Sequence, residues 1–567
     1  MNQSSAPAFS MSASAGRFMP KLNRATLSGD LAAGITTAVM LIPQGMGYAM
    51  LAGLPPIYGL YSAVLPLLVY AAIGSSRQLA VGPVAMVSLL VAAGVGAVAE
   101  QGSESFILYA ILLAFMVGAL QLAMGIGRLG FLVNFLSHPV ISGFTSAAAL
   151  IIGLSQLKHL LGVDIPRTHL VHTVLLTAIE RAAETNLPTF ALGAGGVLVL
   201  VLMKRYAPRL PRALFVVAAG TLIVWGLGLQ QFGVAIVGEV PAGLPPLALP
   251  SFDLDAMASL LPIALTISLV GFMESVAVAK RYARENGYEV DANKELVGLG
   301  MANLLGSFTS SYPTTGGFSR TAVNAQAGAK TTFASVVTAL VVALTLLVLT
   351  PLFYFLPKAI LAAIIMTAVF GLLDIAEVKH LWKVSRRDLF MLVLTFGSTL
   401  MLGIEEGILI GVFASLLLVA VQRLRLRGKL PGRDLWTDAE VHPEIQREGV
   451  LALRLGAQLH FGNVAAFKQQ VRVQQEALDE GRAKVRALLL DAHALRDVDA
   501  SGEAALREIA EECRERDILV WIAGLRDGAR AILERSGLAR HLGAAHLPVD
   551  LERALGAIEA QEQARMT

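Results

Sequence analysis

Arg77-Gln-Leu-Ala-Val-Gly-Pro-Val-Ala-Met-Val-Ser88 is a short apolar segment in which a Gly-Pro pair precedes a short helical stretch. Tyr312-Pro-Thr-Thr-Gly-Gly-Phe-Ser-Arg-Thr-Ala-Val-Asn324 is interrupted in the same way, by a Gly-Gly pair. In membrane transporters, two interrupted segments at matching places in the two halves of a chain point to the binding site. We therefore expect a repeated membrane domain whose site lies where these two segments break.

The composition predicts that most of the chain lies in a membrane. Of 567 residues, 55% are hydrophobic and only 15% are charged, and the mean hydropathy is +0.64. Soluble domains carry about 25% charged residues, and here the charges are concentrated near the carboxyl end of the chain. We expect a cytoplasmic amino-terminal tail (1–28), a transmembrane transporter domain (29–425) and a cytoplasmic soluble domain (426–567).

Fourteen apolar runs approach the length of about 20 residues that spans a bilayer. They lie near 30–52, 57–74, 79–98, 105–126, 131–157, 187–204, 213–231, 256–279, 291–309, 314–329, 331–355, 357–373, 388–404 and 406–422. Basic residues gather in every second loop, as cytoplasmic loops require, although Lys158 and Lys358 are exceptions. An even number of spans places both termini in the cytoplasm. Fourteen spans divide into two sevens of opposite orientation, which predicts a polytopic α-helical protein with a 7+7 inverted repeat.

The two breaks are candidates for an anion site, because a helix amino terminus exposes N–H groups and carries partial positive charge. We expect free N–H groups at Val84 and Ala85 in one break, and at Ser319, Arg320 and Thr321 in the other. A charge at membrane depth is costly, so Arg320 should face a cavity and an anionic partner. The alternatives are ordinary helix kinks, with Arg320 in a structural ion pair or at the cytoplasmic edge.

Glu274 lies deep in the eighth run and is a candidate for coupling to a cation. Burial disfavours the ionised form of a carboxyl group, so Glu274 could carry a proton. Arg320 and a divalent anion sum to about one negative charge, and an ionised Glu274 would repel the anion. Protonation of Glu274, or a bound Na⁺, would therefore favour substrate binding, although a static salt bridge or hydrogen bond is the alternative.

Gln44 and Tyr48 belong to Pro43-Gln-Gly-Met-Gly-Tyr48, which we expect to break the first apolar helix. Their spacing of four residues places both on one helix face. They could line the same cavity with an amide, a hydroxyl and an aromatic ring, or only pack against a neighbouring helix.

Other functions are disfavoured by missing signals. A net charge of +3 gives no reason to expect nucleic acid as a partner, and the single Cys513 excludes an internal disulfide and Cys-type zinc sites. The sequence has neither a P-loop nor an H-E-x-x-H motif. We expect no enzyme activity, no catalytic residue, no metal and no cofactor, with transport driven by an H⁺ or Na⁺ gradient.

The tail alternates between strand and helix patterns. Strands are predicted at 449–455, 485–491 and 517–523, and helices at 463–478 and 501–516. This alternation predicts a small α/β domain.

The chain resembles the SulP anion transporters, the sulfate permeases and their relatives, from about residue 29 to about residue 560. The resemblance is carried by three stretches: Ile42-Pro-Gln-Gly-Met-Gly-Tyr-Ala-Met-Leu-Ala-Gly-Leu-Pro-Pro-Ile-Tyr-Gly-Leu-Tyr61, Gly74-Ser-Ser-Arg-Gln-Leu-Ala-Val-Gly-Pro83 and Gly317-Phe-Ser-Arg-Thr-Ala-Val-Asn324. It implies fourteen segments in two inverted repeats, divided into a core and a gate domain, and a homodimer.

By the same resemblance, the anion site lies between the third and tenth half-helices. The implied site residues are Gln44, Tyr48, Val84, Ala85, Ser319 and Arg320. Glu274 stands where relatives have a carboxylate linked to cation coupling. Animal relatives often have Phe at the position of Val84, so pocket size and selectivity cannot be copied from them.

The tail resembles a STAS domain through Leu490-Asp-Ala-His-Ala-Leu-Arg-Asp-Val-Asp-Ala-Ser-Gly502. Anti-sigma-factor antagonists with this domain are phosphorylated on a serine in this loop, and Ala500 stands where they commonly have it. We therefore expect Ser501 to cap the following helix rather than to be phosphorylated. A regulatory protein could bind this domain.

These observations lead to one expected function and several alternatives. We expect a secondary active anion transporter of the inner (plasma) membrane that takes up sulfate with H⁺ by alternating access. The alternatives are Na⁺-coupled transport of bicarbonate or a dicarboxylate, an anion exchanger or channel, a nucleobase carrier, and a sensor that signals through its tail. The sequence leaves the anion and the coupling cation open.

Overall fold

The computed structural model describes residues 24–130, 138–165, 171–207, 210–403 and 439–566, the last range with gaps at 443–444, 446, 448, 457, 461–462 and 481–484, and scattered residues between 406 and 417. It forms two compact units. One comprises Met1–Val133, Ala147–Leu373 and Leu400–Glu405, and the other comprises Asn134–Ser146, Asp374–Thr399 and Glu406–Thr567.

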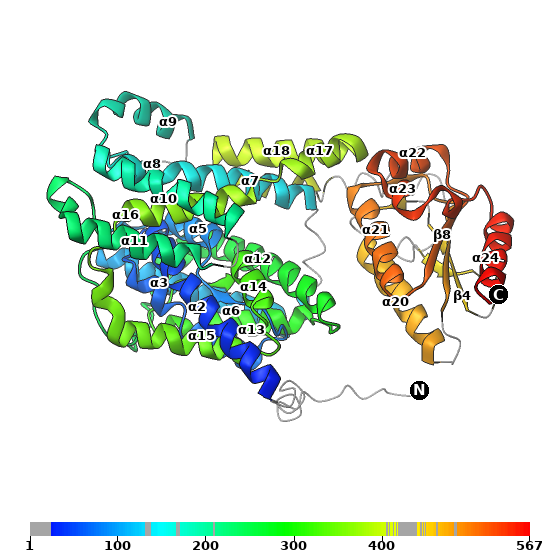
Figure 1. Cartoon of the computed structure of the whole chain (residues 1–567), viewed down its shortest axis with the longest axis horizontal. Helices are drawn as coiled ribbons and strands as arrows, with labels where there is room; N and C mark the ends of the chain where they lie inside the picture. The colour runs from blue at the N-terminus through cyan, green and yellow to red at the C-terminus, as the bar shows by residue number, and fades with distance from the viewer. Residues whose placement is uncertain are drawn as a thin grey trace. The chain divides into compact units, whose positions relative to one another are not determined.

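The first unit is a bundle of helices (Figure 1). Its α-helices are α2 (Arg24–Leu51), α3 (Ile57–Tyr61), α4 (Leu65–Ile73), α5 (Ala85–Gly96), α6 (Glu104–Ile126), α7 (His138–Ser155, which begins in the second unit), α8 (Leu157–Leu161), α9 (Val171–Glu180), α10 (Leu187–Tyr206), α11 (Arg212–Leu227), α12 (Leu254–Glu285), α13 (Ala292–Ser307), α14 (Phe318–Gln326), α15 (Phe333–Leu344) and α16 (Lys358–Val369). Two strands of two residues each, β1 (Val81–Gly82) and β2 (Thr315–Gly316), precede α5 and α14.

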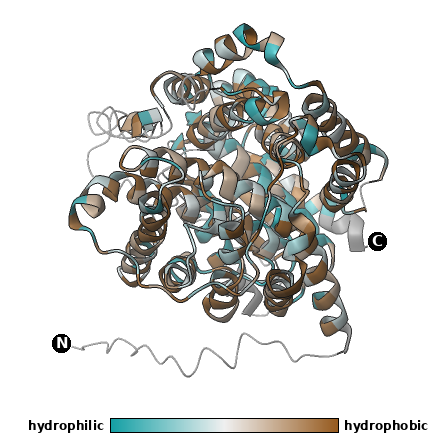
Figure 2. Cartoon of the chain, turned by 90° about the vertical axis from the view of Figure 1, so that its left-hand side faces the viewer, coloured by the Kyte–Doolittle hydropathy of each residue, from teal (hydrophilic) through white to brown (hydrophobic). Residues whose placement is uncertain are grey.

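The helices of this unit have the character of membrane helices. Six helices in the described ranges are long and apolar enough to cross a membrane, and several shorter apolar helices accompany them. Large apolar side chains on α10 and α11 are exposed, among them Leu198, Phe215 and Trp225. Brown, hydrophobic residues dominate the helices in Figure 2. Outward-facing apolar side chains of this kind suit lipid rather than water.

The expected apolar runs correspond to helical segments as far as residue 402, with differences in length. The run 57–74 is divided into α3 and α4, and the runs 79–98 and 314–329 each contain a strand and a short helix. The start of the run 131–157 and parts of the last run, 406–422, lie outside the described residues. Two short helices, α9 and α17 (Ile375–Val384), were not expected.

The predicted break in the first helix is wrong, because α2 continues through Pro43. A proline removes one backbone hydrogen bond, which membrane helices tolerate when their neighbours compensate. The glycines beside it allow close packing instead. A Cβ on Gly45 would lie 3.1 Å from the carbonyl oxygen of Gly59 on α3, and a Cβ on Gly59 would lie 1.9 Å from that of Gly45.

α13 packs against α4, α6 and α12. Its contact with α6 is formed by backbone against backbone, since a Cβ on Gly300 would lie 2.5 Å from the nitrogen of Leu122. A Cβ on Gly118 would lie 2.4 Å from the nitrogen of Leu304. Small residues at such crossings are typical of membrane helices. Their close contact fixes the position of α13 relative to α6.

The second unit contains an α/β domain, which confirms the predicted strands and helices of the tail. Strands β3 (Ala439–Val441), β4 (Val450–Leu455), β6 (Ala487–Asp491) and β8 (Leu519–Ala523) form one sheet in that order. β3 is antiparallel to β4, and the other pairs are parallel. β5 (Gln458–Leu459) and β7 (Asp497–Val498) form a separate parallel pair.

Helices cover both faces of this sheet. They are α20 (Val464–Glu480), α21 (Ala500–Glu515), α22 (Asp527–Ser536), α23 (Leu538–Leu542) and α24 (Leu551–Met566). One face packs mainly on α20 to α22, and the other packs on Ala554 and Ile558 of α24. All five residues of β6 are accordingly buried, as in a parallel sheet covered on both sides. The unit also includes α17 and most of α18 (Arg386–Leu402), whose last residues belong to the first unit.

The expectation that Ser501 caps α21 is wrong. The N-cap is Asp499, whose carboxylate accepts a hydrogen bond of 2.7 Å from the N–H of Gly502. The helix begins at Ala500, so Ser501 lies inside its first turn. An aspartate caps as well as a serine does and adds a favourable charge at the helix amino terminus.

Candidate functional site

The two interrupted segments lie side by side and are hydrogen-bonded to each other. β1 and β2 pair antiparallel, with Val81 opposite Gly316 and Gly82 opposite Thr315. The N–H of Gly317 also donates to the carbonyl of Ala80 at 3.2 Å. Each strand leads directly into a short helix, so the amino termini of α5 and α14 start from one shared ladder.

Both helix amino termini are left without a side-chain cap. Val84 and Gly317 occupy the N-cap positions in extended conformations, and neither position makes a side-chain capping bond. The first intrahelical bonds run from Ser88 N to Val84 O and from Thr321 N to Gly317 O. The N–H groups before them, at Ala85 to Val87 and at Phe318 to Arg320, have no hydrogen-bond acceptor among the described residues.

Thr321 differs from the expectation that its N–H is free. That N–H is already bonded to Gly317, because Thr321 is one residue beyond the unpaired first turn. Its hydroxyl accepts a hydrogen bond of 3.1 Å from the N–H of Ala80. One turn later, Asn324 donates to the carbonyl of Gln78 at 2.8 Å. Both side chains therefore hold α14 against the opposite segment.

Arg320 extends from α14 across to the other break and is only 1% exposed. Its Nη1 donates to the carbonyl of Pro83. Its Nε and Nη2 have no hydrogen-bond partner within the described part of the chain. Glycines make room for this path, since a Cβ on Gly317 would lie 3.1 Å from Nη2 and one on Gly82 would lie 3.4 Å from it. Two strong donors thus stay available beside the helix termini.

Two further predicted residues, Glu274 and Tyr48, lie near this guanidinium. Glu274 and Tyr48 are close enough to Arg320 to interact with it electrostatically. Tyr48 and Gln44 are buried, at 5% and 3% exposure. Gln44 Oε1 and Glu274 Oε2 have no hydrogen-bond partner in the described ranges. Unpaired buried polar atoms are costly and call for a ligand or a function, and Glu274 Oε2 is such an atom near Arg320.

Glu274 and Arg320 are not hydrogen-bonded to each other, so the structure does not show the static salt bridge. Glu274 is held in place through its neighbour Ser275 on α12. The Ser275 hydroxyl accepts from the N–H of Gly316 at 2.8 Å and lies 2.7 Å from the hydroxyl of Thr315. α12 is thereby fixed to β2 at the residue next to the carboxylate.

Val84, Ala85 and Ser319 complete the predicted set. Val84 and Ala85 are 6% exposed, whereas Ser319 is exposed at the start of α14. The structure thus brings the two breaks together with Arg320, Glu274 and Tyr48. A cavity of about 710 Å³, lined by residues such as Met50, Leu89 and Lys158, contains none of the predicted site residues.

Two residues on α13 were missed by the sequence reasoning. Glu295 is fully buried and accepts four hydrogen bonds: from Tyr70 OH (2.6 Å), Ser75 N (2.8 Å), Ser75 Oγ (2.6 Å) and Ser76 N (3.0 Å). It fixes the loop that enters β1.

Asn303 fixes the segment that leads into β2, as Glu295 fixes the loop that enters β1. Its Oδ1 accepts from Thr314 N at 2.7 Å, and its Nδ2 donates to Thr314 O at 3.0 Å. α13 thus fixes both segments just before their strands begin. The available signal was a carboxylate and an amide within the apolar run 291–309, since polar groups at membrane depth are rarely without function.

The described residues contain no group of three or more His, Cys, Asp or Glu side chains that could hold a metal ion. The groups named above for the site are helix N–H groups, one guanidinium, one amide, one phenol and one carboxyl group.

Comparison with known proteins identifies the family. The model of the sulfate permease family matches residues 27–395, and the STAS domain model matches residues 442–554. Sulfate transporter 4.1, chloroplastic, of Arabidopsis thaliana is 40% identical over 531 residues, covering 91% of this chain and 77% of the relative. Sulfate transporter 2.1 of the same plant is 37% identical over 508 residues, with 85% and 75% covered.

Two solved structures have a similar fold. The murine Solute Carrier 26 family member A9 anion transporter in the inward-facing state has a TM-score of 0.69 at 25% identity, covering 99% of this chain and 96% of the other. The transmembrane domain of a cyanobacterium bicarbonate transporter, BicA, has a TM-score of 0.60 at 26% identity, with 70% and 98% covered. The predicted resemblance is confirmed: the chain belongs to the sulfate permease family and carries a carboxyl-terminal STAS domain.

Proposed function

We propose that the protein is a secondary active anion transporter that takes up sulfate together with H⁺. The observation that carries this proposal is the meeting of two uncapped helix amino termini around Arg320, whose Nε and Nη2 have no partner among the described residues. Partial positive charge from two helices and one full charge suit a divalent oxyanion. The relatives named as sulfate transporters support sulfate as that anion.

The proposed site residues are those that the sequence suggested. Ala85 and Ser319 would bind the anion through their N–H groups, while Val84 sets the size of the pocket. Arg320 would bind sulfate oxygens through Nε and Nη2, and Gln44 and Tyr48 would line the remaining wall. The contacts of Thr321 support a role in holding the two segments together rather than in touching the anion.

Glu274 is the proposed coupling residue. Sulfate and Arg320 together carry about one negative charge, and an ionised Glu274 would add a second within electrostatic range. A proton on Glu274 removes that repulsion, so sulfate and H⁺ would bind together. The Oε2 atom is buried and has no protein partner in the described part of the chain, so a proton bound there would displace no hydrogen bond.

The remaining parts of the proposal concern architecture. We propose fourteen segments in a 7+7 inverted repeat, with a core and a gate domain that expose the site alternately on the two sides of the inner (plasma) membrane. The proposed divisions are 1–28, 29–425 and 426–567, with both termini in the cytoplasm and a homodimer as the assembly. A regulatory protein at the STAS domain belongs to the same proposal.

Na⁺-coupled bicarbonate transport is the second candidate, and one observation favours it. The structural neighbour BicA is titled a bicarbonate transporter and covers the membrane part of the chain at 26% identity. The same donors would bind a planar monovalent anion. Na⁺ would then replace the proton in compensating Glu274.

Uptake into proteoliposomes tests both candidates. Radiolabelled sulfate is supplied with and without an inward proton gradient, in the absence of Na⁺. Accumulation that depends on the gradient supports H⁺–sulfate symport. If the folded protein accumulates no sulfate, the proposal is refuted, and labelled bicarbonate with an inward Na⁺ gradient is the next substrate to supply.

A further inference from the structure

The second unit contains a buried contact between the helix pair α17–α18 and the amino terminus of α21. Asp388 of α18 accepts a hydrogen bond of 2.8 Å from the N–H of Ala500, the first residue of α21. Asp388 and Ala500 are 8% and 5% exposed. A carboxylate at a helix amino terminus is electrostatically favourable, so Asp388 marks the point where the STAS domain meets α18.

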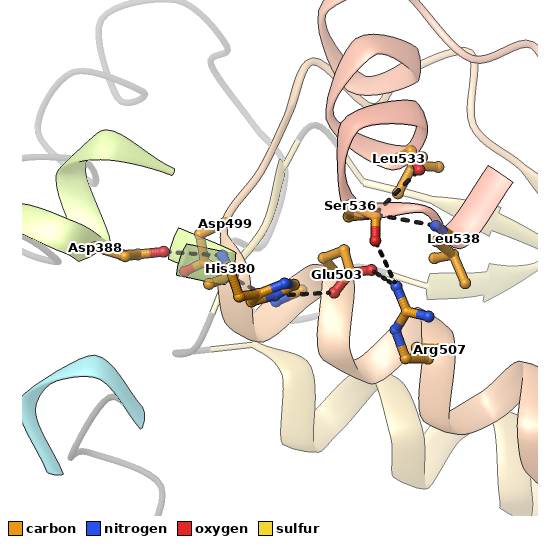
Figure 3. A network of polar contacts seen from close by, with 10 residues as sticks. His380, Asp388, Asp499, Glu503, Arg507, Leu533, Ser536 and Leu538 are labelled. Atoms are coloured by element: carbon orange, nitrogen blue, oxygen red, sulfur yellow. Dashed lines mark hydrogen bonds and ion pairs between the residues drawn. The ribbon is translucent and has the colours of Figure 1, made fainter. Parts of the chain in front are cut away.

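A charge network lies beside this point, one turn further along α21 (Figure 3). Glu503 is almost fully buried, with 1% of its side chain exposed. It accepts a hydrogen bond of 2.6 Å from Arg507 and lies 3.5 Å from Nε2 of His380 on α17. Arg507 also donates to the carbonyl of Ser536 at 3.2 Å. The buried carboxylate thus has one partner from its own domain and one from α17.

The apolar part of the contact is small. Leu381, Val384 and Leu392 pack against Ala500 and Ile532. The cluster has only five buried members, and ordering their side chains costs conformational entropy. The polar partners of Glu503 and Asp388 therefore have a measurable share in holding the two parts together.

His380 is the titratable member of this network near neutral pH. The charged groups that face it are Glu503 and Arg507 on α21 and Glu377 on its own helix. The hydrogen bond to Glu503 raises the pKa of His380 above its usual value, against the opposing effect of burial. Burial raises the pKa of Glu503, but the hydrogen bonds from His380, Ser536 and Arg507 outweigh this and lower it.

We propose that His380 and Glu503 form a proton-sensitive latch that holds the STAS domain on α17–α18. The protonated imidazole closes the latch, and its neutral form weakens it. This inference goes beyond the proposed function. The docking of the STAS domain on α17–α18 does not depend on which anion is transported or on how transport is coupled. If H⁺ enters with sulfate on the side where the STAS domain lies, transport itself would close the latch.

The direction of the pH dependence follows from linkage. The pKa of His380 is higher in the docked state than in the undocked state, so docking takes up protons. The stabilisation is complete below the ordinary histidine pKa of about 6.5 and is lost as the pH rises through the raised value. The hydrogen bond from Arg507 to Glu503 does not involve His380 and is present in either case.

Hydrogen exchange at Ala500 reports docking directly, since its N–H is bonded to Asp388 across the contact. The full-length protein in lipid nanodiscs is measured between pH 6 and pH 8.5, and each rate is divided by the intrinsic rate at that pH. We expect the protection factor of Ala500 to fall by about fivefold over this range, the change that an ion pair of about 1 kcal/mol produces. Amides of β6 should show no such change.

Two variants separate the latch from general effects of charge. His380→Gln should lower the protection to its alkaline value and remove the pH dependence. Lys379→Gln, next to it on the exposed side of α17, removes a positive charge that has no part in the latch and should retain the wild-type profile. The proposal is refuted if the wild-type protection does not fall with pH, or if His380→Gln keeps the wild-type slope.

Discussion

The guanidinium of Arg320 donates a hydrogen bond to the carbonyl of Pro83, although the two residues belong to different chain breaks. Together with the β1–β2 ladder, this bond joins the segments that precede α5 and α14. The arginine therefore has two functions in one position. It fixes the relative placement of two helix amino termini, and it presents Nε and Nη2, which lack partners in the described part of the chain, between them.

Because Nε and Nη2 of Arg320 lack partners in the described part of the chain, replacing Arg320 should affect anion binding more than folding. Arg320→Ala removes two donors, each worth about 1.5–3 kcal/mol when charged, and should raise the sulfate dissociation constant at least tenfold. Arg320→Lys keeps the charge but not the planar fork, and should give an intermediate value. Isothermal titration with sulfate measures both, and unchanged affinity in Arg320→Ala would remove Arg320 from the site.

A substitution at Gly317 tests whether the close packing around the Arg320 guanidinium matters for anion binding. In Gly317→Ala the new Cβ would lie 3.1 Å from Arg320 Nη2 and 3.2 Å from Val84 Cγ1. Both neighbours must shift by a few tenths of an ångström, so we expect sulfate affinity to fall several-fold. Gly195→Ala on α10 is the control, because its Cβ meets nothing within 4 Å. If the two variants have the same affinity, the fit of Arg320 against Gly317 is irrelevant to binding.

Glu274→Gln should separate sulfate movement from the proton gradient. The amide has nearly the shape of the protonated carboxyl group but cannot release a proton. We expect sulfate to equilibrate across proteoliposomes without accumulating when an inward proton gradient is applied. The measurement is uptake with and without the gradient, and the control is counterflow, which should persist. Gradient-driven accumulation in the variant would assign coupling to another residue.

The packing of the STAS domain can be tested at Cys513, the one cysteine of the chain. Cys513 is 2% exposed, and burial raises the pKa of its thiol to about 11. Since the thiolate is the reactive form, the native protein at pH 8 should react with iodoacetamide at least about 100-fold more slowly than the urea-unfolded chain. Mass spectrometry of timed samples gives both rates. Rapid labelling of the native protein would show that α21 does not pack as described.

The sequence predicted the parts of the site that carry an unusual residue in an apolar run. Arg320, Glu274 and the two breaks were found because charge, glycine and proline are conspicuous there. The pairing of β1 with β2 was not predictable, because strands of two residues show no periodicity. The N-cap is Asp499 and not the expected Ser501, because helix boundaries predicted from sequence are uncertain by several residues. The break at Pro43 was predicted wrongly, since neighbouring helices decide whether a proline is tolerated.

Glu295 lies within an apolar run, but the sequence does not indicate which part of the site it contacts. It follows Asp291 and Lys294 near the edge of an apolar run, where a carboxylate is expected to face water. Only the close packing of α13 on α4 and α6 places it beside Ser75 and Ser76. Glu295 therefore positions the loop that enters β1, and this role can be measured.

Replacements of Glu295 should distinguish positioning from folding. Glu295→Ala leaves the N–H groups of Ser75 and Ser76 and the hydroxyl of Tyr70 without their acceptor, and should destabilise the protein by about 3 kcal/mol or more. Glu295→Gln keeps one acceptor oxygen and the same volume, so it should fold with a melting temperature near that of the wild type. Its loop into β1 should be held less firmly, and sulfate affinity should fall several-fold while the maximal uptake rate changes less.

Thermal denaturation and the dependence of uptake on sulfate concentration measure these two effects separately. Glu289→Gln, an exposed carboxylate in the preceding loop, is the matched control and should behave as the wild type in both assays. A Glu295→Gln protein with wild-type affinity would mean that the carboxylate only stabilises α13 and α4. A loss of affinity without a loss of stability would instead show that α13 sets the position of the first helix amino terminus, and through it the geometry of the anion site.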